Sequence, residues 1–197
     1  MAMTEEQWDK KLKIHTTGRL DSHADQYRYP YEPTPYVVLE RLAESGYLKK
    51  ENIVIDYGCG KGRVGLFLHY MIGCETVGLE YDAAIFQQAQ ENKNTAAKGQ
   101  GVTFYHADAA EFPAAGADCF YFFNPFSVEI LKSVMGRITE SYYENPRRMR
   151  LFFYYPNDEY LVYLMTMYAL AFVEEIDCRD LFPGKDERER ILIFELT

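Results

Sequence analysis

The sequence lacks several features that would place the protein in a special class. No apolar run approaches the roughly 20 residues that a membrane-spanning helix requires, and the polar start Met-Ala-Met-Thr-Glu-Glu does not resemble a secretory signal. The four cysteines are widely spaced and form no C-x-x-C pair. We therefore expect a cytoplasmic protein with reduced thiols, no zinc site and no membrane segment.

Basic residues are also scarce. Lys and Arg number 21 against 30 Asp and Glu, so the formal net charge is −9. Nucleic-acid binders usually carry a basic face that neutralises phosphates, so this charge disfavours a nucleic-acid partner. A neutral or cationic substrate, either a small molecule or a protein, suits an acidic surface better. The 197 residues, 48% of them hydrophobic, are enough for one domain with a full core.

From residue 52 onward, predicted strands and helices alternate. Strands are predicted at 52–56, 75–80, 102–106, 118–123 and 149–155, and helices at 61–72, 82–97, 127–140 and 157–168. Two further strands, at 169–178 and 190–196, have no helix between them. Helix-linked strands imply a mostly parallel, doubly wound α/β sheet, and the terminal hairpin implies an antiparallel last strand.

The first 50 residues precede this pattern. A capping-box sequence predicts a short helix over residues 4–14. Thr34 followed by a proline predicts the N-cap and first residue of a second helix that ends near residue 46. We expect a single domain over 1–197, made of a helical N-terminal extension at 1–50 and an α/β core at 51–197.

The most informative segment is Asp56-Tyr57-Gly58-Cys59-Gly60-Lys61-Gly62. It follows the apolar run Ile53-Val54-Ile55 and leads into apolar residues at helical spacing, so it predicts a strand, a glycine turn and a helix. Such a turn exposes backbone N–H groups at the carboxyl edge of a parallel sheet, where a ligand can approach closely. This D-x-G-x-G-x-G pattern resembles motif I of the class I methyltransferases that use S-adenosylmethionine (SAM).

Acidic residues follow the next two predicted strands. Glu80 ends the strand at 75–80, where a carboxylate can accept both hydroxyl groups of a ribose, and Asp108 follows the strand at 102–106. The resemblance implies that Asp108 and the N–H group of Ala109 bind adenine. The cofactor site implied for SAM consists of Asp56, Gly58, Gly60, Gly62, Glu80, Tyr81, Asp108 and Ala109.

The predicted strand at 118–123 opens into Asn124-Pro125-Phe126. This resembles motif IV of amino methyltransferases, [Asn/Asp/Ser]-Pro-Pro-[Tyr/Phe], in which the first side chain and a Pro carbonyl orient the substrate amine and the aromatic ring packs on the methyl group. This chain has one Pro and not two, and Asn-Pro is also a good turn former. Two interpretations stay open: Asn124, Pro125 and Phe126 are catalytic, or they form a structural turn beside the pocket.

Tyrosines crowd the N-terminal extension. Tyr29, Tyr31 and Tyr36 fall within one short stretch that leads into the second predicted helix. An aromatic cover over the cofactor pocket would exclude water and contact the substrate, so these three residues are candidate substrate-binding residues. The alternative is that the rings pack the extension onto the sheet edge.

Two other functions compete with methyl transfer. The segment Gly60–Gly65 matches G-x-G-x-x-G, so an NAD-dependent oxidoreductase is an alternative, although Asp56 would repel a pyrophosphate. A non-catalytic SAM-binding protein is another. The conjunction of motifs favours a SAM-dependent methyltransferase whose acceptor is an amine nitrogen of a small molecule or of a protein side chain.

Overall fold

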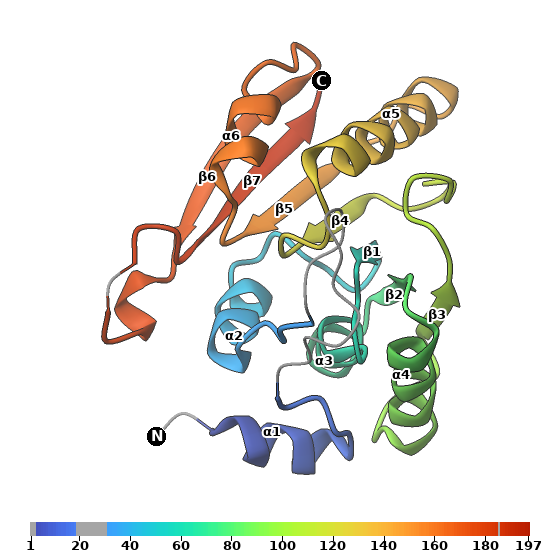
Figure 1. Cartoon of the computed structure of the whole chain (residues 1–197), viewed down its shortest axis with the longest axis vertical. Helices are drawn as coiled ribbons and strands as arrows, with labels where there is room; N and C mark the ends of the chain where they lie inside the picture. Colours follow the sequence, from blue (N-terminus) through green and yellow to red (C-terminus); the bar gives the residue numbers. More distant parts are fainter. Residues whose placement is uncertain (1–2, 19–30, 185) are drawn as a thin grey trace.

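A mixed seven-stranded sheet forms the centre of the protein (Figure 1). The computed structural model describes residues 3–18, 31–184 and 186–197. The strands are β1 (Ile53–Tyr57), β2 (Glu75–Glu80), β3 (Val102–His106), β4 (Cys119–Phe122), β5 (Arg150–Tyr154), β6 (Leu170–Asp177) and β7 (Arg190–Leu196). Their order across the sheet is β3-β2-β1-β4-β5-β7-β6.

The strand directions agree with the predicted connections. The strands β1 to β5 pair in parallel, whereas β7 pairs antiparallel with both β5 and β6. The predicted doubly wound sheet with an antiparallel last strand is therefore confirmed. The chain order reverses between β1 and β4, which leaves a crevice at the carboxyl ends of these two strands.

Helices cover both faces of the sheet. They are α1 (Glu5–Leu12), α2 (Tyr36–Glu44), α3 (Arg63–Ile72), α4 (Ala83–Thr95), α5 (Val128–Glu144) and α6 (Asp158–Leu164), and a 3₁₀ turn, η1 (Arg179–Leu181), lies in the last hairpin. None of the helices in the described ranges is both long and apolar enough to cross a bilayer.

Alternating residues of the strands pack into two separate hydrophobic cores, one on each face of the sheet. Val54 of β1 packs with residues of α1, α2, α3 and α4, whereas the next residue, Ile55, packs with residues of α5 and α6. The same alternation in β4 places Tyr121 in the first core and Phe120 and Phe122 in the second. A period of two along each strand is what burial on both faces requires.

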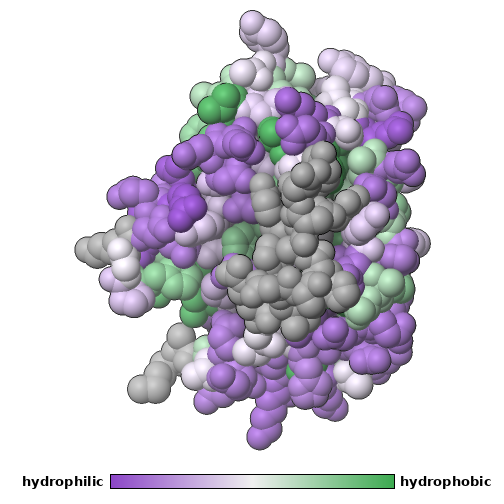
Figure 2. Space-filling model, viewed as in Figure 1, coloured by the Kyte–Doolittle hydropathy of each residue, from purple (hydrophilic) through white to green (hydrophobic). Residues whose placement is uncertain are grey.

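The N-terminal extension is built on the first core. The capping box is confirmed, because Thr4 accepts from the N–H of Gln7 and the Gln7 side chain accepts from the N–H of Thr4. The predicted N-cap of α2 is wrong: Pro35 is the N-cap, and the Thr34 hydroxyl lies 3.0 Å from the hydroxyl of Tyr121 instead. Polar residues cover much of the outer side of α1, at the bottom of the molecule in Figure 2.

The helix predicted at 157–168 ends earlier than expected. After Leu164 the chain tightens into i→i+3 hydrogen bonds, from Thr166 to Tyr163 and from Met167 to Leu164. Tyr168 is consequently exposed to solvent and lies outside the helix. The apolar spacing alone did not indicate this stop.

Candidate functional site

A cavity of about 520 Å³ opens at the crevice between β1 and β4. The loops after β1, β2, β3 and β4 form its wall, together with the end of the N-terminal extension. Most of the predicted site residues meet there: the wall includes Tyr31, Asp56, Gly58, Gly60, Glu80, Tyr81, Asp108, Ala109, Asn124, Pro125 and Phe126.

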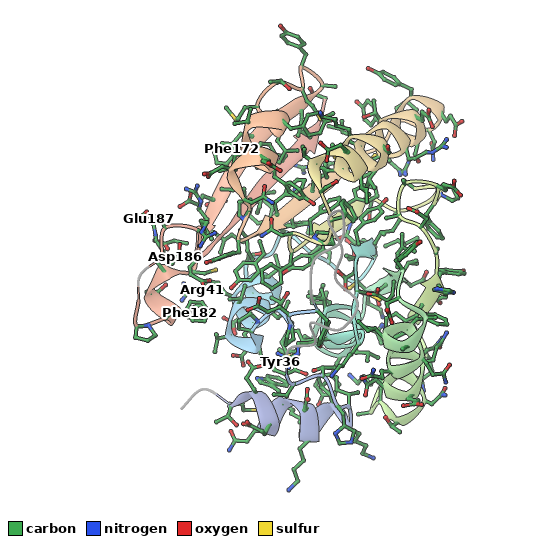
Figure 3. The ribbon with its side chains drawn as sticks, in the orientation of Figure 1. Tyr36, Arg41, Phe172, Phe182, Asp186 and Glu187 are labelled. Atoms are coloured by element: carbon green, nitrogen blue, oxygen red, sulfur yellow. The ribbon has the colours of Figure 1, made fainter. Side chains whose placement is uncertain are left out.

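Two predicted site residues lie elsewhere, and the structure does not describe a third. Gly62 is not on the cavity wall but caps α3 with a φ of 85°. Tyr36 is buried in the first core, where its ring lies 5.7 Å from that of Trp8, between α1 and α2 (Figure 3), so a substrate contact does not fit its position. Tyr29 lies outside the described residues.

The glycine loop is shaped by protein neighbours as well as by the cavity. Gly58, Gly60 and Gly62 all have positive φ values, of 72°, 55° and 85°, which disfavour any residue with a Cβ atom. A Cβ atom would also collide with Pro125 at Gly58, with the Tyr31 ring at Gly60 and with the Phe104 ring at Gly62. The contact with Pro125 joins the loop after β1 directly to the loop after β4.

Glu80 holds the glycine loop from the neighbouring strand. Its Oε2 atom accepts from the N–H of Gly60 at 2.9 Å, and its Oε1 atom accepts from the N–H of Asp82 at 2.8 Å. Burial raises the pKa of Glu80, although these N–H donors act in the opposite direction. A carboxylate oxygen has two acceptor sites, so both oxygens can still take hydroxyl donors from a ligand.

Asp56 is a buried acid with unused acceptor capacity. Its side chain lies on the cavity wall, and Oδ2 has no hydrogen-bond partner among the described residues. Burial, and then the charge of nearby Glu80, raises the pKa of Asp56 to about 8. A cationic ligand at this wall would supply the missing counter-charge and favour the ionised carboxylate.

The loop after β4 is held in place by Asn124. The residue has a φ of 40°, its Nδ2 atom donates to the carbonyl of Tyr155 at 2.6 Å, and its Oδ1 atom accepts from the N–H of Asn157 at 3.1 Å. Both ends of the amide therefore bind the loop that follows β5. This geometry favours a positioning role for Asn124 over direct contact with a substrate.

Phe126 is fixed just as firmly. Its side chain is buried, with its ring edge-on to those of Tyr57 and Phe122, and its carbonyl accepts from the hydroxyl of Tyr160 at 2.6 Å. The same stretch of wall includes Phe123 and Ile130, which the sequence analysis did not single out. These residues give the β4 end of the cavity a rigid, apolar lining.

The wall near β3 contains another residue that sequence reasoning missed. His106 lines the cavity, and its Nε2 atom lies 2.9 Å from the carbonyl of Tyr81. The ring of Phe86 stacks on that of His106 at 5.6 Å. The pairing of Glu80 with His106 across β2 and β3 brings the histidine to this edge, and such register is not visible in the sequence.

Known proteins share this architecture. Residues 54–141 match the family model described as a methyltransferase domain, whereas no curated protein matches the chain. An RNA methyltransferase from Salinibacter ruber, solved with S-adenosyl-L-homocysteine, has 19% identity and a TM-score of 0.57, with 84% of this chain and 94% of that chain covered. Magnesium protoporphyrin IX methyltransferase from Synechocystis PCC 6803, solved with SAM, has 18% identity and a TM-score of 0.59, with coverages of 82% and 77%.

The matched domain and the strand order define the fold of the protein. The chain has the class I methyltransferase fold, and residues 54–141 match a methyltransferase domain, in agreement with the resemblance of the glycine motif. The NAD-dependent alternative does not fit, because the matched domain is a methyltransferase domain and β7 is inserted antiparallel between β5 and β6. The solved relatives act on acceptors as different as RNA and a porphyrin, so the fold alone does not name the acceptor.

Proposed function

We propose that the protein methylates an amine nitrogen of a small molecule or of a protein side chain. The observation that carries the proposal is the chemistry of the cavity wall. Acidic side chains of Glu32, Asp56, Glu80, Asp82 and Asp108 line it, together with apolar and aromatic groups. An acidic wall attracts a cationic amine, and aromatic rings accommodate the methylated cation that forms.

The cofactor is proposed to lie along the wall from the glycine loop to the end of β3. Asp56 faces the positively charged end of SAM, Glu80 accepts from the ribose hydroxyls, and Asp108 with the N–H of Ala109 meets the adenine. Support comes from the free Oδ2 atom of Asp56 and from the position of all four residues on one cavity wall.

The remaining wall is proposed to hold the acceptor. It contains Tyr31 and Glu32 of the N-terminal extension and Phe123 and Phe126 of the loop after β4. SAM supplies an activated methyl group when bound, so the protein mainly has to align the nitrogen lone pair with that group and exclude water. Asn124 contributes by fixing the loop that carries Pro125 and Phe126.

A transfer assay with methyl-labelled SAM tests this proposal. The purified protein is incubated with panels of primary amines, phenols, carboxylic acids and total RNA, and label in each product is counted. Transfer to amines, reduced in the Asn124→Ala variant, supports the proposal. Transfer confined to phenols, carboxylic acids or RNA would overturn the acceptor class while leaving the cofactor assignment intact.

A further inference from the structure

Arg63 is a buried cation on the wall of an otherwise acidic cavity. It is the first residue of α3, directly after the glycine loop, and only 2% of its side chain is exposed. Among the described wall residues it is the sole Lys or Arg. Neither motif resemblance nor periodicity assigned it a role.

Two of the three guanidinium nitrogens are occupied by the N-terminal extension. Nε donates to the hydroxyl of Thr16 at 2.7 Å, whereas Nη1 pairs with Glu5 and donates to the carbonyl of Thr34 at 3.1 Å. The guanidinium also lies 4.1 Å from the ring centre of Tyr36. Nη2 is buried and makes no hydrogen bond within the described part of the chain.

The nearest acid does not satisfy this free nitrogen. Asp9 Oδ1 is 3.9 Å from Nη2, beyond hydrogen-bond distance. The carboxylate of Asp9 is instead saturated by the hydroxyl of Tyr36 and by hydroxyl and N–H groups of Thr16 and Thr17. Burial opposes the ionisation of Asp9, but these donors outweigh it and lower its pKa. An unpaired guanidinium N–H in a buried position calls for an anionic acceptor.

The start of α3 favours the same kind of ligand. No side chain caps this helix, because its N-cap is Gly62. The N-terminus of a helix carries a partial positive charge that attracts carboxylates and phosphates. Arg63, the first residue of this uncapped helix, therefore brings a guanidinium nitrogen without a hydrogen-bond partner to the same cavity wall as Asp56, whose Oδ2 atom also has no partner.

We propose that Arg63 binds the carboxylate of the amino-acid end of SAM and thereby couples cofactor binding to the N-terminal extension. The zwitterionic end of SAM then has both counter-charges, Asp56 for its cationic groups and Arg63 for its carboxylate. The proposal rests on the SAM site described above.

Thr16 and Tyr31 connect Arg63 of the cofactor site to the N-terminal extension. The hydroxyl of Tyr31 donates to the carbonyl of Thr16 at 2.6 Å, and the ring of Tyr31 lies against Gly60. Thr16 thus links Arg63 to the aromatic ring that covers the glycine loop. A ligand that fixes the guanidinium stabilises Thr16, and with it the position of Tyr31.

Calorimetric titration with SAM and with decarboxylated SAM, without any acceptor, tests the assignment. The two ligands share the sulfonium and the ammonium and differ only in the carboxylate. The wild-type protein is expected to bind SAM about 10- to 100-fold more tightly, the scale of a charge-assisted hydrogen bond. Equal affinities would overturn the proposal. They would also show that no other residue gains affinity by binding the SAM carboxylate.

Variants locate the effect. Arg63→Met is expected to lose the preference for SAM while keeping its affinity for decarboxylated SAM, and a preserved preference in a folded variant would overturn the proposal. Lys61→Met is the matched control: it removes a neighbouring cation, which lies 5.1 Å from the Tyr31 ring centre, and should keep the preference. Failure of the wild-type protein to bind either ligand would instead contradict the cofactor assignment itself.

Amide hydrogen exchange on the wild-type protein tests the coupling without any variant, in case Arg63→Met does not fold. Saturating SAM is expected to slow exchange in residues 5–18 more than saturating decarboxylated SAM does. The α5 helix serves as the internal reference, since it is remote from Arg63 in sequence and packs on the opposite face of the sheet. Equal protection of residues 5–18 by the two ligands would overturn the coupling.

Discussion

Glu80 Oε2 accepts a hydrogen bond from the main-chain N–H of Gly60 at 2.9 Å. The end of β2 thereby holds the loop that follows β1 in its ligand-binding shape. Because Asp82 N–H donates to the other oxygen, one carboxylate fixes both the glycine loop and the entry into α4. Glu80 is thus a structural tie as well as the proposed ribose acceptor.

Replacing Glu80 should therefore affect both binding and stability. We expect Glu80→Ala to weaken SAM binding by about 1–3 kcal/mol, because charge-assisted hydrogen bonds are lost. It should also lower the melting temperature, since the N–H of Gly60 loses its acceptor. Glu80→Gln keeps one acceptor oxygen, so its SAM affinity measured by calorimetry should lie between those of the wild-type protein and Glu80→Ala. Unchanged SAM affinity in a folded Glu80→Ala variant would remove Glu80 from the cofactor site.

The raised pKa of Asp56 predicts pH-dependent binding. Burial first, and the charge of Glu80 second, raises this pKa to about 8, well above the ordinary value for an aspartate. The empty folded protein therefore holds a proton that the unfolded chain has released, so the contribution of Asp56 to stability falls as the pH rises from about 4 to about 8. Cationic SAM favours the ionised carboxylate, so its affinity should increase between about pH 6 and pH 8.

Asp56→Asn is the variant that isolates this effect. Compared in the same buffers, it should show a flatter pH dependence of SAM affinity and release fewer protons on binding than the wild-type protein. Its melting temperature at about pH 8 should be higher than that of the wild-type protein, because no buried carboxyl remains to ionise. Parallel pH profiles for the two proteins would contradict this account of Asp56.

The hydrogen bonds of Asn124 distinguish a positioning role from direct catalysis. Asn124→Ala removes both bonds and leaves a residue with a Cβ atom at a φ of 40°, so the free energy of unfolding should fall by about 1–3 kcal/mol. Turnover should fall as well, while the dissociation constant for SAM stays within about twofold of the wild-type value. Asn124→Gly, which relieves the backbone strain, should recover some stability but not the turnover. Abolished turnover with unchanged stability would point to direct substrate contact instead.

The contact between Tyr31 and Gly60 predicts a pair of coupled substitutions. Gly60→Ala should destabilise the protein by about 1–3 kcal/mol, because the new Cβ atom meets the Tyr31 ring and the φ of 55° disfavours alanine. The double variant with Tyr31→Ala should recover the steric part of this loss. Gly46→Ala is the matched control, since it has a φ of 77° with nothing within 4 Å. If Gly60→Ala lowers the free energy of unfolding equally with and without Tyr31, the contact does not contribute to that loss.

Local sequence signals predicted most of the fold. The Thr4 capping box and the strand ends at Glu80 and His106 depend on neighbours within a few residues, and the structure has them where the pattern places them. The chemistry of the glycine motif likewise indicated where the cavity would open. These features are encoded within single turns or strands, which is why one sequence was enough.

Long-range contacts decided what the sequence did not predict. The sequence analysis placed Tyr36 in an aromatic cover over the pocket. In the structure Trp8 and Asp9, more than 25 positions away, hold it in the core. The sequence analysis attributed the lack of a side chain at Gly60 to the close approach of a ligand. In the structure the Tyr31 ring also packs against this position. Arg63 was overlooked because its significance lies in the partners that it has and the one that it lacks.

Calorimetric titration of the purified protein with S-adenosyl-L-homocysteine, with NAD⁺ in parallel, tests the central claim most directly. The cavity at the carboxyl ends of β1 and β4 predicts one binding site per chain with micromolar affinity for S-adenosyl-L-homocysteine and no heat of binding from NAD⁺. No binding of S-adenosyl-L-homocysteine by the folded protein, or binding of NAD⁺ alone, would contradict the assignment of this cavity to SAM.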